Sequence, residues 1–273
     1  MALTHAGIVH QPWGQSTLAY LPIEEVIIKA WVVDVSARVV LTQVFKNESE
    51  NTTARAKYVF PLLERSAVCA FELQHADGRL IVGSVKESEV AEQAFETAVA
   101  SGRTAALVER VTDDIFAISV GSIPAREQVT TRITFIMDLL DQGLRDHVRL
   151  QLPLTIFGRY GPLPAAMVGA ASASSTTRVD VNVYVQMSDT IHAIRSLNHP
   201  IKVSQHNTHN GRKPQWMSAS WASRALVPGD FVLTIYADGL DKPRCFAEID
   251  TESTDGTIGM QLTLVPSFNA LRS

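Results

Sequence analysis

The chain has 273 residues, of which 46% are hydrophobic and 19% charged, with a formal net charge of −4. This composition excludes a disordered chain and allows a sizeable core in one large or two ordinary domains. The sequence has no run of lysine and arginine, which argues against nucleic-acid binding, because phosphate contacts need a clustered basic face.

The first half of the chain reads as strand after strand. Apolar residues alternate with polar ones, which is the pattern of side chains that point to opposite faces of a sheet. The expected strands are residues 24–35, 37–47, 55–60, 67–76, 79–85, 105–111, 114–121 and 128–137.

One segment of the first half has a helical period instead. In residues 86–102, KESEVAEQAFETAVASG, Ala91, Ala94, Phe95 and Ala98 fall at i, i+3, i+4 and i+7. They make one apolar stripe on a helix, which we expect to pack across a sheet face or to close one end of a sandwich.

The second half returns to strands after residues 140–150. The clearest alternation is RVDVNVYVQM at residues 178–187, and further strands are expected at 147–154, 230–237, 244–250 and 256–265. Residues 155–178 and 198–215 lack the pattern and read as loops. Asp77-Gly78, Asp238-Gly239 and Asp255-Gly256 are typical of hairpin turns, since both residues tolerate positive φ.

These elements predict an all-β protein. The first domain, residues 1–143, should be an antiparallel β-sandwich with one helix, because clean alternation is typical of antiparallel sheets with one wet face. The second, residues 144–273, should be a β-rich, sandwich-like domain.

The cellular location is predicted from the targeting and membrane segments that the sequence does not show. The N-terminal MALTHAGIVHQPWGQ has neither the basic nor the apolar segment of a signal peptide, and no apolar run approaches the roughly 20 residues of a spanning helix. Two cysteines, Cys69 and Cys245, are too few for a disulfide framework. We expect a cytoplasmic protein with no membrane span, in which the sequons at Asn47 and Asn51 are only a polar loop.

Cys69 is the one candidate nucleophile. It lies in AVCAFE, between Val68 and Ala70, with no histidine beside it in sequence. A reactive thiol needs a lowered pKa and some exposure, whereas a buried free cysteine behaves as a small hydrophobe. We therefore expect Cys69 to belong to the core.

A second candidate site lies around residues 206–221. His206 and His209 are three apart, but two histidines do not make a zinc site, even with His199 nearby, and a solvated loop is the better interpretation. Exposed tryptophans could stack on the C–H face of a sugar while neighbouring amides bind its hydroxyls. The alternative is that one or both tryptophans are buried and anchor the second sheet. The candidate ligand-binding residues are Trp216, Trp221, Asn207, His209, Asn210 and Arg212.

Several segments of the first half keep a fixed order and spacing over roughly residues 15 to 140. They are LTQVFKN (41–47), AKYVFPL (56–62), AVCAFE (67–72), DGR (77–79), VKESEVAEQAFETAVASGRTAALVE (85–109) and DIFAISVGSIPAREQV (114–129). In this order they resemble the vault protein inter-alpha-trypsin (VIT) domain, in which the cysteine of AVCAFE has no catalytic role.

The second half resembles the β-rich segment that joins a VIT domain to a von Willebrand factor A domain. MQLTLVPSFN (260–269) resembles the strand just ahead of that domain, so the resemblance implies a fragment or a chain without its A domain. An A-domain metal loop would need Asp-x-Ser-x-Ser, and in DVSAR (34–38) Arg38 replaces the second serine.

The function expected from these observations is a non-enzymatic module that binds a protein partner or an adjoining A domain. No hydrolase, phosphate-loop or zinc-protease motif stands out, and we expect no catalytic residue, metal or cofactor. The alternative is a carbohydrate-binding protein that uses the Trp216 and Trp221 region.

Overall fold

The computed structural model describes residues 4–14, 18–61, 65–83, 108–112, 115–140, 146–156, 177–206, 214–225, 229–249 and 256–265. Within these ranges the chain forms strands and no helix. The helix expected at residues 86–102 lies outside the described residues.

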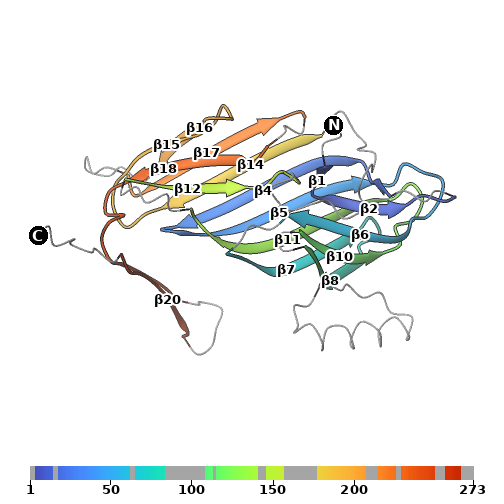
Figure 1. Ribbon diagram of the computed structural model, residues 1–273, viewed down its shortest axis with the longest axis horizontal. Helices are drawn as coiled ribbons and strands as arrows, with labels where there is room; N and C mark the ends of the chain where they lie inside the picture. The colour runs from blue at the N-terminus through green and yellow to red at the C-terminus, as the bar shows by residue number, and fades with distance from the viewer. Residues whose placement is uncertain are drawn as a thin grey trace, which may run out of the picture.

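The largest element is an eight-stranded sheet (Figure 1). In spatial order its strands are β16 (Lys202–His206), β17 (Trp216–Ser223), β14 (Arg178–Gln186), β4 (Ile23–Val33), β5 (Ser36–Lys46), β11 (Gln128–Asp138), β7 (Ser66–His75) and β8 (Leu80–Gly83). All neighbours are antiparallel except β14 and β4, which pair in parallel. A parallel pair needs a long crossover, so this contact joins segments far apart in sequence.

Two smaller sheets cover one face of the large one. The first has five strands in the order β3 (Ala19–Tyr20), β2 (Gly7–Gln11), β6 (Ala54–Pro61), β10 (Ile115–Gly121) and β9 (Val108–Thr112). The second has three, β12 (His147–Leu152), β18 (Phe231–Ala237) and β15 (Ile191–Arg195). Two separate pairs complete the topology: β1 (Thr4–His5) with β13 (Thr155–Ile156), and β19 (Arg244–Ile249) with β20 (Ile258–Thr263).

Alternation along each strand builds the core between these layers. In β5 the odd-numbered residues from Ala37 to Phe45 are buried and the even-numbered ones are not. The ring of Phe45 meets the edge of Tyr58 in β6, with centroids 6.3 Å apart, and Tyr58 also contacts Phe71 of β7 at 5.4 Å. Such inward-facing aromatic side chains hold the two layers together.

The expected boundary at residues 143 and 144 does not separate two sheets. β14, from the second half, pairs with β4, from the first half, over nine residue pairs. One continuous core contains residues of both halves, such as Ile28 and Val181. The two halves of the chain therefore share one large sheet and one core.

Most expected strands are present within a few residues of their predicted bounds. The prediction of a loop over residues 198–215 was wrong in part, because residues 202–206 form β16 at the edge of the large sheet. Asp77-Gly78 does close the β7–β8 hairpin, with φ of 87° at Gly78. Asp238-Gly239 does not join paired strands, because β18 pairs with β12 and β15.

The first sequon has a structural role. Asn47 is buried, and its side-chain amide donates hydrogen bonds to the carbonyls of Asn51, Ile123 and Pro124 at 2.9, 3.2 and 2.8 Å. Its Oδ1 accepts from the backbone N–H and hydroxyl of Ser49. Asn47 thus ties the loop after β5 to the loop before β11.

Replacing Asn47 with alanine is expected to lower the free energy of unfolding by about 2–3 kcal/mol, because buried carbonyls lose their donors. The same change at Asn51, the exposed sequon residue, should stay within about 0.5 kcal/mol of the unchanged chain. Urea denaturation of both variants measures the difference, and equal midpoints would contradict this role for Asn47.

Candidate interaction surfaces

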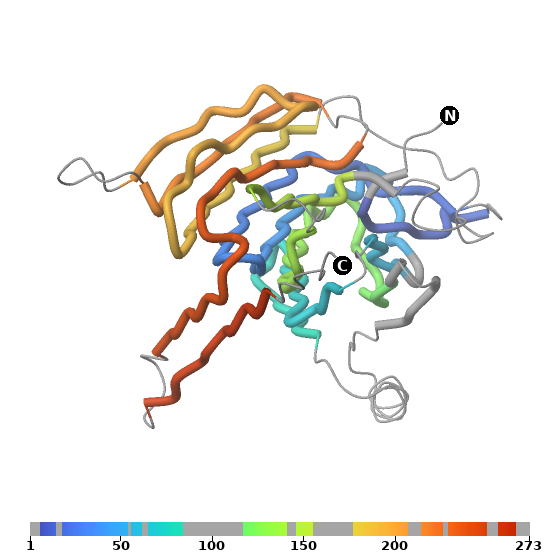
Figure 2. The backbone as a smooth tube through the Cα atoms, turned by 60° about the vertical axis from the view of Figure 1, so that its left-hand side comes forward, coloured from blue at the N-terminus to red at the C-terminus, as the bar shows by residue number. Residues whose placement is uncertain are grey.

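The β19–β20 hairpin extends away from the sandwich (Figures 1 and 2). Its strands pair from Arg244 with Thr263 to Ile249 with Ile258. Because side chains alternate, one face of the hairpin contains only apolar side chains and a thiol. This hairpin apolar face consists of Cys245, Ala247, Ile249, Ile258, Met260 and Leu262.

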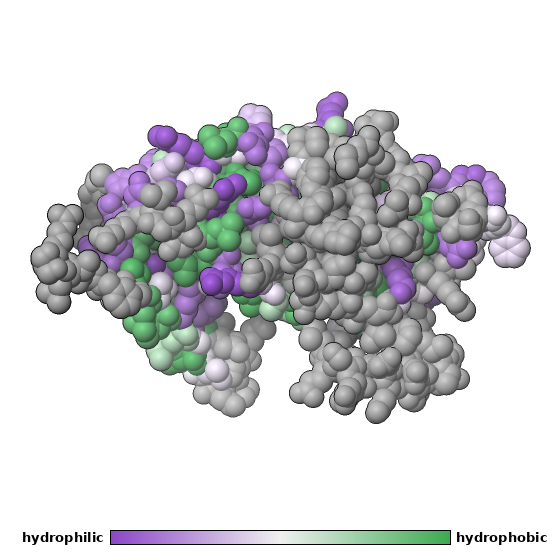
Figure 3. Space-filling model, in the orientation of Figure 1, coloured by the Kyte–Doolittle hydropathy of each residue, from purple (hydrophilic) through white to green (hydrophobic). Residues whose placement is uncertain are grey.

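The hairpin apolar face is open to solvent. Ile258, Ile249, Leu262 and Met260 are 59, 63, 64 and 76% exposed, and apolar side chains gather over the hairpin in the space-filling view (Figure 3). Folded monomers rarely expose contiguous apolar patches of this kind unless the patch binds something. The hairpin apolar face is therefore the first candidate interaction surface.

A buried ion pair anchors the base of this hairpin. Arg244 donates from Nε to Oδ1 of Asp34 at 2.6 Å, and both side chains are almost completely buried. Arg244 also donates to the carbonyls of Gly239 and Lys242. Thr263, on the other strand, donates its hydroxyl to Oδ2 of Asp34 at 2.7 Å.

Asp34 is placed for this task by the turn between β4 and β5. It has φ of 54°, the left-handed region that aspartate tolerates better than most residues, and it starts the two-residue connection between the strands. Asp34 lies in this turn, so the prediction that it belongs to a strand was wrong. Its carboxylate instead fixes a hairpin that begins 210 residues later.

The second candidate surface is the face of the eight-stranded sheet that no other described strand covers, here called the outer face. Two rows of paired residues cross the strands from β16 to β11. They are Ser204, Ser218, Tyr184, Trp31, Arg38 and Ile136 in one row, and Lys202, Ser220, Asn182, Lys29, Val40 and Thr134 in the next.

An aromatic and cationic stack lies in the first of these rows. The rings of Trp31 and Tyr184 are stacked, with centroids 6.0 Å apart and planes at 21°. The guanidinium of Arg38 lies 5.8 Å from the centroid of Trp31. Since β14 and β5 flank β4, Tyr184 and Arg38 lie on opposite sides of Trp31 along the row.

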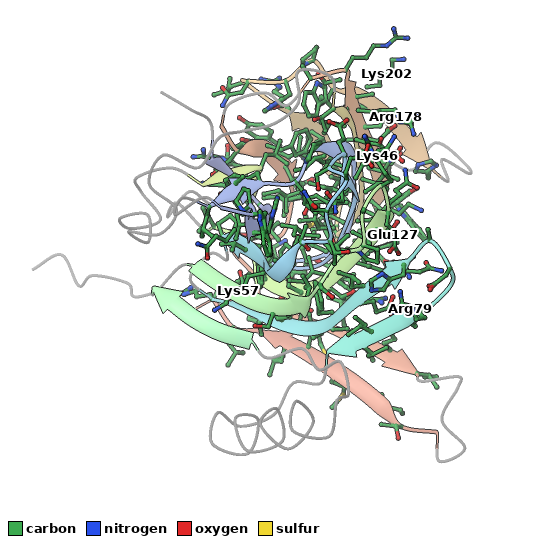
Figure 4. The ribbon with its side chains drawn as sticks, turned by 90° about the vertical axis from the view of Figure 1, so that its right-hand side faces the viewer. Lys46, Lys57, Arg79, Glu127, Arg178 and Lys202 are labelled. Atoms are coloured by element: carbon green, nitrogen blue, oxygen red, sulfur yellow. The ribbon has the colours of Figure 1, made fainter. Side chains whose placement is uncertain are left out.

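The outer face carries charges of both signs, with Lys29, Arg38 and Lys202 in the two rows and the carboxylates of Asp180 and Asp138 in the rows on either side. Lys202, Arg178 and Lys46 lie along one side of the molecule, and Lys57 lies on the other side (Figure 4). Arg178 is paired with Glu25 at 2.6 Å. Lys29 and Lys202 make no ion pair within the residues that the structure describes.

The two tryptophans of the expected sugar site lie on opposite faces of β17. Trp216 is 44% exposed on the outer face, opposite His206. Trp221 is 6% exposed and packs in the core against Phe231, with centroids 5.9 Å apart. Residues five apart on a strand point to opposite sides, so the two rings do not form one platform.

The other expected ligand residues, Asn207, His209, Asn210 and Arg212, lie outside the described residues. His206 contacts the hydroxyl of Ser218 at 2.8 Å. His199 packs against Trp221 and Phe231, and burial lowers the pKa of its imidazole. His199 and His206 are thus not brought together as ligands.

Cys69 does not belong to the core, which corrects the sequence analysis. It is exposed, and its thiol donates a weak hydrogen bond to the carbonyl of Ala67, with 3.7 Å between Sγ and the oxygen. The pairing of β7 with β11 shifts between Ala70 and Val68, so Cys69 is the extra residue of a β-bulge. A bulge switches which residues point inward, which the sequence pattern alone did not reveal.

In the described part of the chain, no group of three or more histidine, cysteine, aspartate or glutamate side chains could hold a metal ion. Within the same residues, no helix is both long and apolar enough to cross a membrane.

Comparison with known proteins points to one family over residues 23–135, which match the family model described as the vault protein inter-alpha-trypsin domain. Over 137 residues the chain is 39% identical to the Mus musculus protein mono-ADP-ribosyltransferase PARP4, covering 50% of this chain and 6% of that protein. Over 246 residues it is 24% identical to a von Willebrand factor A domain-containing protein of Dictyostelium discoideum, covering 90% of this chain and 25% of that one.

These relatives are much longer than the matched region, since the chain spans a quarter of their length or less. A solved Legionella pneumophila structure aligns with 86% of this chain and 72% of its own, at 10% identity. Its TM-score of 0.49 is too low to support a conclusion.

Proposed function

Since residues 23–135 form a VIT domain, we propose that this chain is a non-enzymatic interaction module whose hairpin apolar face docks against an adjoining protein domain. The observation that carries the proposal is the exposure of that face on a hairpin held by the buried Asp34–Arg244 pair. The partner we propose is a von Willebrand factor A domain, for which the Dictyostelium relative is named.

The energetics favour a covered hairpin. A two-stranded hairpin is at best marginally stable in water without a third element against it. Burying a side chain such as Leu262 or Met260 contributes about 1.5–3 kcal/mol each. Covering Ile249, Ile258, Met260 and Leu262 together therefore provides a driving force for association with an apolar surface.

The double change Met260→Asp and Leu262→Asp is expected to abolish this docking, because a carboxylate buried without a partner is strongly unfavourable. Isothermal titration calorimetry of the chain with a purified A domain from the Dictyostelium relative measures the affinity. We expect at least a hundredfold weaker binding for the double variant.

Leu80→Asp is the matched control, since Leu80 is 54% exposed on β8 and lies outside the hairpin. It should bind like the unchanged chain. Retained binding by the double variant, or equal loss in the control, would remove the hairpin from the proposal.

Carbohydrate binding is the second candidate function, and the exposure of Trp216 favours it. Trp216 pairs with Gln186 on one side and with His206 on the other, and Ser218 lies two residues further along the same strand. These polar side chains could supply hydrogen bonds to a sugar. Only one of the two expected tryptophans is accessible to a sugar, since Trp221 belongs to the core. Reproducible binding of one sugar class on a glycan array, lost in Trp216→Ala, would favour this function over docking.

A further inference from the structure

We propose that the outer face of the eight-stranded sheet is a second docking surface, and that its occupant is an extended acidic segment of a partner protein. This surface is separate from the hairpin apolar face, and the proposal does not depend on it. It rests on the Tyr184–Trp31–Arg38 stack and on the cations in the two rows around it.

The geometry of the stack favours a polypeptide over a sugar. A sugar packs its C–H face on the face of an aromatic ring, and the ring of Trp31 already stacks with Tyr184 and has the guanidinium of Arg38 over it. Trp31 is nevertheless 37% exposed, and Ile136 in the same row is 48% exposed. These exposed apolar edges are suited to aliphatic or aromatic side chains of a peptide.

The charges of the two rows favour an acidic occupant. Lys202, Lys29 and Arg38 belong to these rows, and neither row contains a carboxylate. The neighbouring rows bring the carboxylates of Asp180 and Asp138 to the same face, so the positive charge is confined to the two rows themselves, in a chain with a net charge of −4. Opposite charge on a partner would steer its approach and set its register.

The dimensions favour an extended segment. The rows cross six strands from β16 to β11, and neighbouring strands lie about 4.8 Å apart, so the rows are roughly 24 Å long. An extended chain advances about 3.4 Å per residue, so about seven residues would follow the rows. Glutamate or aspartate at alternate positions would then face the cations.

The experiment uses two fluorescein-labelled ten-residue peptides, one of alternating glutamate and leucine and one of alternating lysine and leucine. Fluorescence anisotropy with the whole chain measures their affinity at low and at physiological salt. We expect the acidic peptide to bind and the basic one not to, with weaker binding as the salt concentration rises. The double change Lys29→Glu and Arg38→Glu should weaken binding of the acidic peptide at least about tenfold.

Lys57→Glu is the matched control, because Lys57 lies on the other side of the molecule (Figure 4). This variant also replaces a cation with a carboxylate, and it should leave the affinity for the acidic peptide unchanged. Circular dichroism of each variant checks that the fold is retained. The proposal is overturned if both peptides bind equally, if neither binds, or if the Lys29 and Arg38 double variant binds normally. A glycan that binds the unchanged chain and is lost in Trp216→Ala would also overturn it, in favour of carbohydrate binding.

Discussion

Replacing Arg244 with methionine is expected to lower the free energy of unfolding by about 3–5 kcal/mol, the usual cost of removing one partner from a buried ion pair. Among the described side chains, the carboxylate of Asp34 would keep the hydroxyl of Thr263 as its donor while it stays buried. The carbonyls of Gly239 and Lys242 would lose their donor as well. Guanidinium denaturation followed by tryptophan fluorescence measures the change.

The matched control is Arg178→Met. Arg178 pairs with Glu25 across β14 and β4, but its side chain is 66% exposed. Exposed pairs contribute about 0–1 kcal/mol, so this variant should remain close to the unchanged chain. A similar small effect for Arg244→Met would mean that the hairpin is not anchored through Asp34.

The hairpin should respond to the same change in a second measurement. Hydrogen exchange of the β19 and β20 amides is expected to accelerate more than exchange in β4 and β5, because the hairpin loses its tie while the large sheet keeps its ladders. Uniform acceleration across the chain would indicate global destabilisation instead.

Replacing Phe45 with alanine is expected to cost about 3–5 kcal/mol, because the side chain lies fully buried between the large sheet and the five-stranded sheet. The loss combines the transfer of the ring to water with the cavity left beside Tyr58. Thermal unfolding and urea denaturation both report it.

Val44→Ala is the control on the same strand. Val44 precedes Phe45 and points to the outer face, where it is only partly buried. We expect a loss below about 1 kcal/mol there, since little surface is removed from contact. Equal losses at the two positions would contradict the inward assignment of Phe45 and the packing of the two layers.

The individual strands could be predicted from sequence because the signal is local. Alternation along RVDVNVYVQM places Val179, Val181, Val183 and Val185 on one face, and all four are buried. The order of segments from LTQVFKN to DIFAISVGSIPAREQV was sufficient to identify the VIT domain, which the family match over residues 23–135 confirms.

Part of the candidate surfaces could also have been read from local pattern. Trp216 and Trp221 differ by an odd number of positions, so a strand through both must separate them, but the segment was not recognised as a strand. In the hairpin, Ile258, Met260 and Leu262 alternate with polar residues or glycine. That pattern predicts an apolar face on one side of the hairpin. It does not reveal whether other described elements of the chain cover that face.

The tertiary structure decided the features that depend on contacts between distant segments. The parallel pairing of β14 with β4 brings Tyr184 beside Trp31, and the Asp34–Arg244 pair joins residues 210 apart. The bulge at Cys69 reversed which residues of β7 face inward. Periodicity determines which side of a strand is apolar, whereas the choice of neighbouring strand and its register depends on how all the layers pack together.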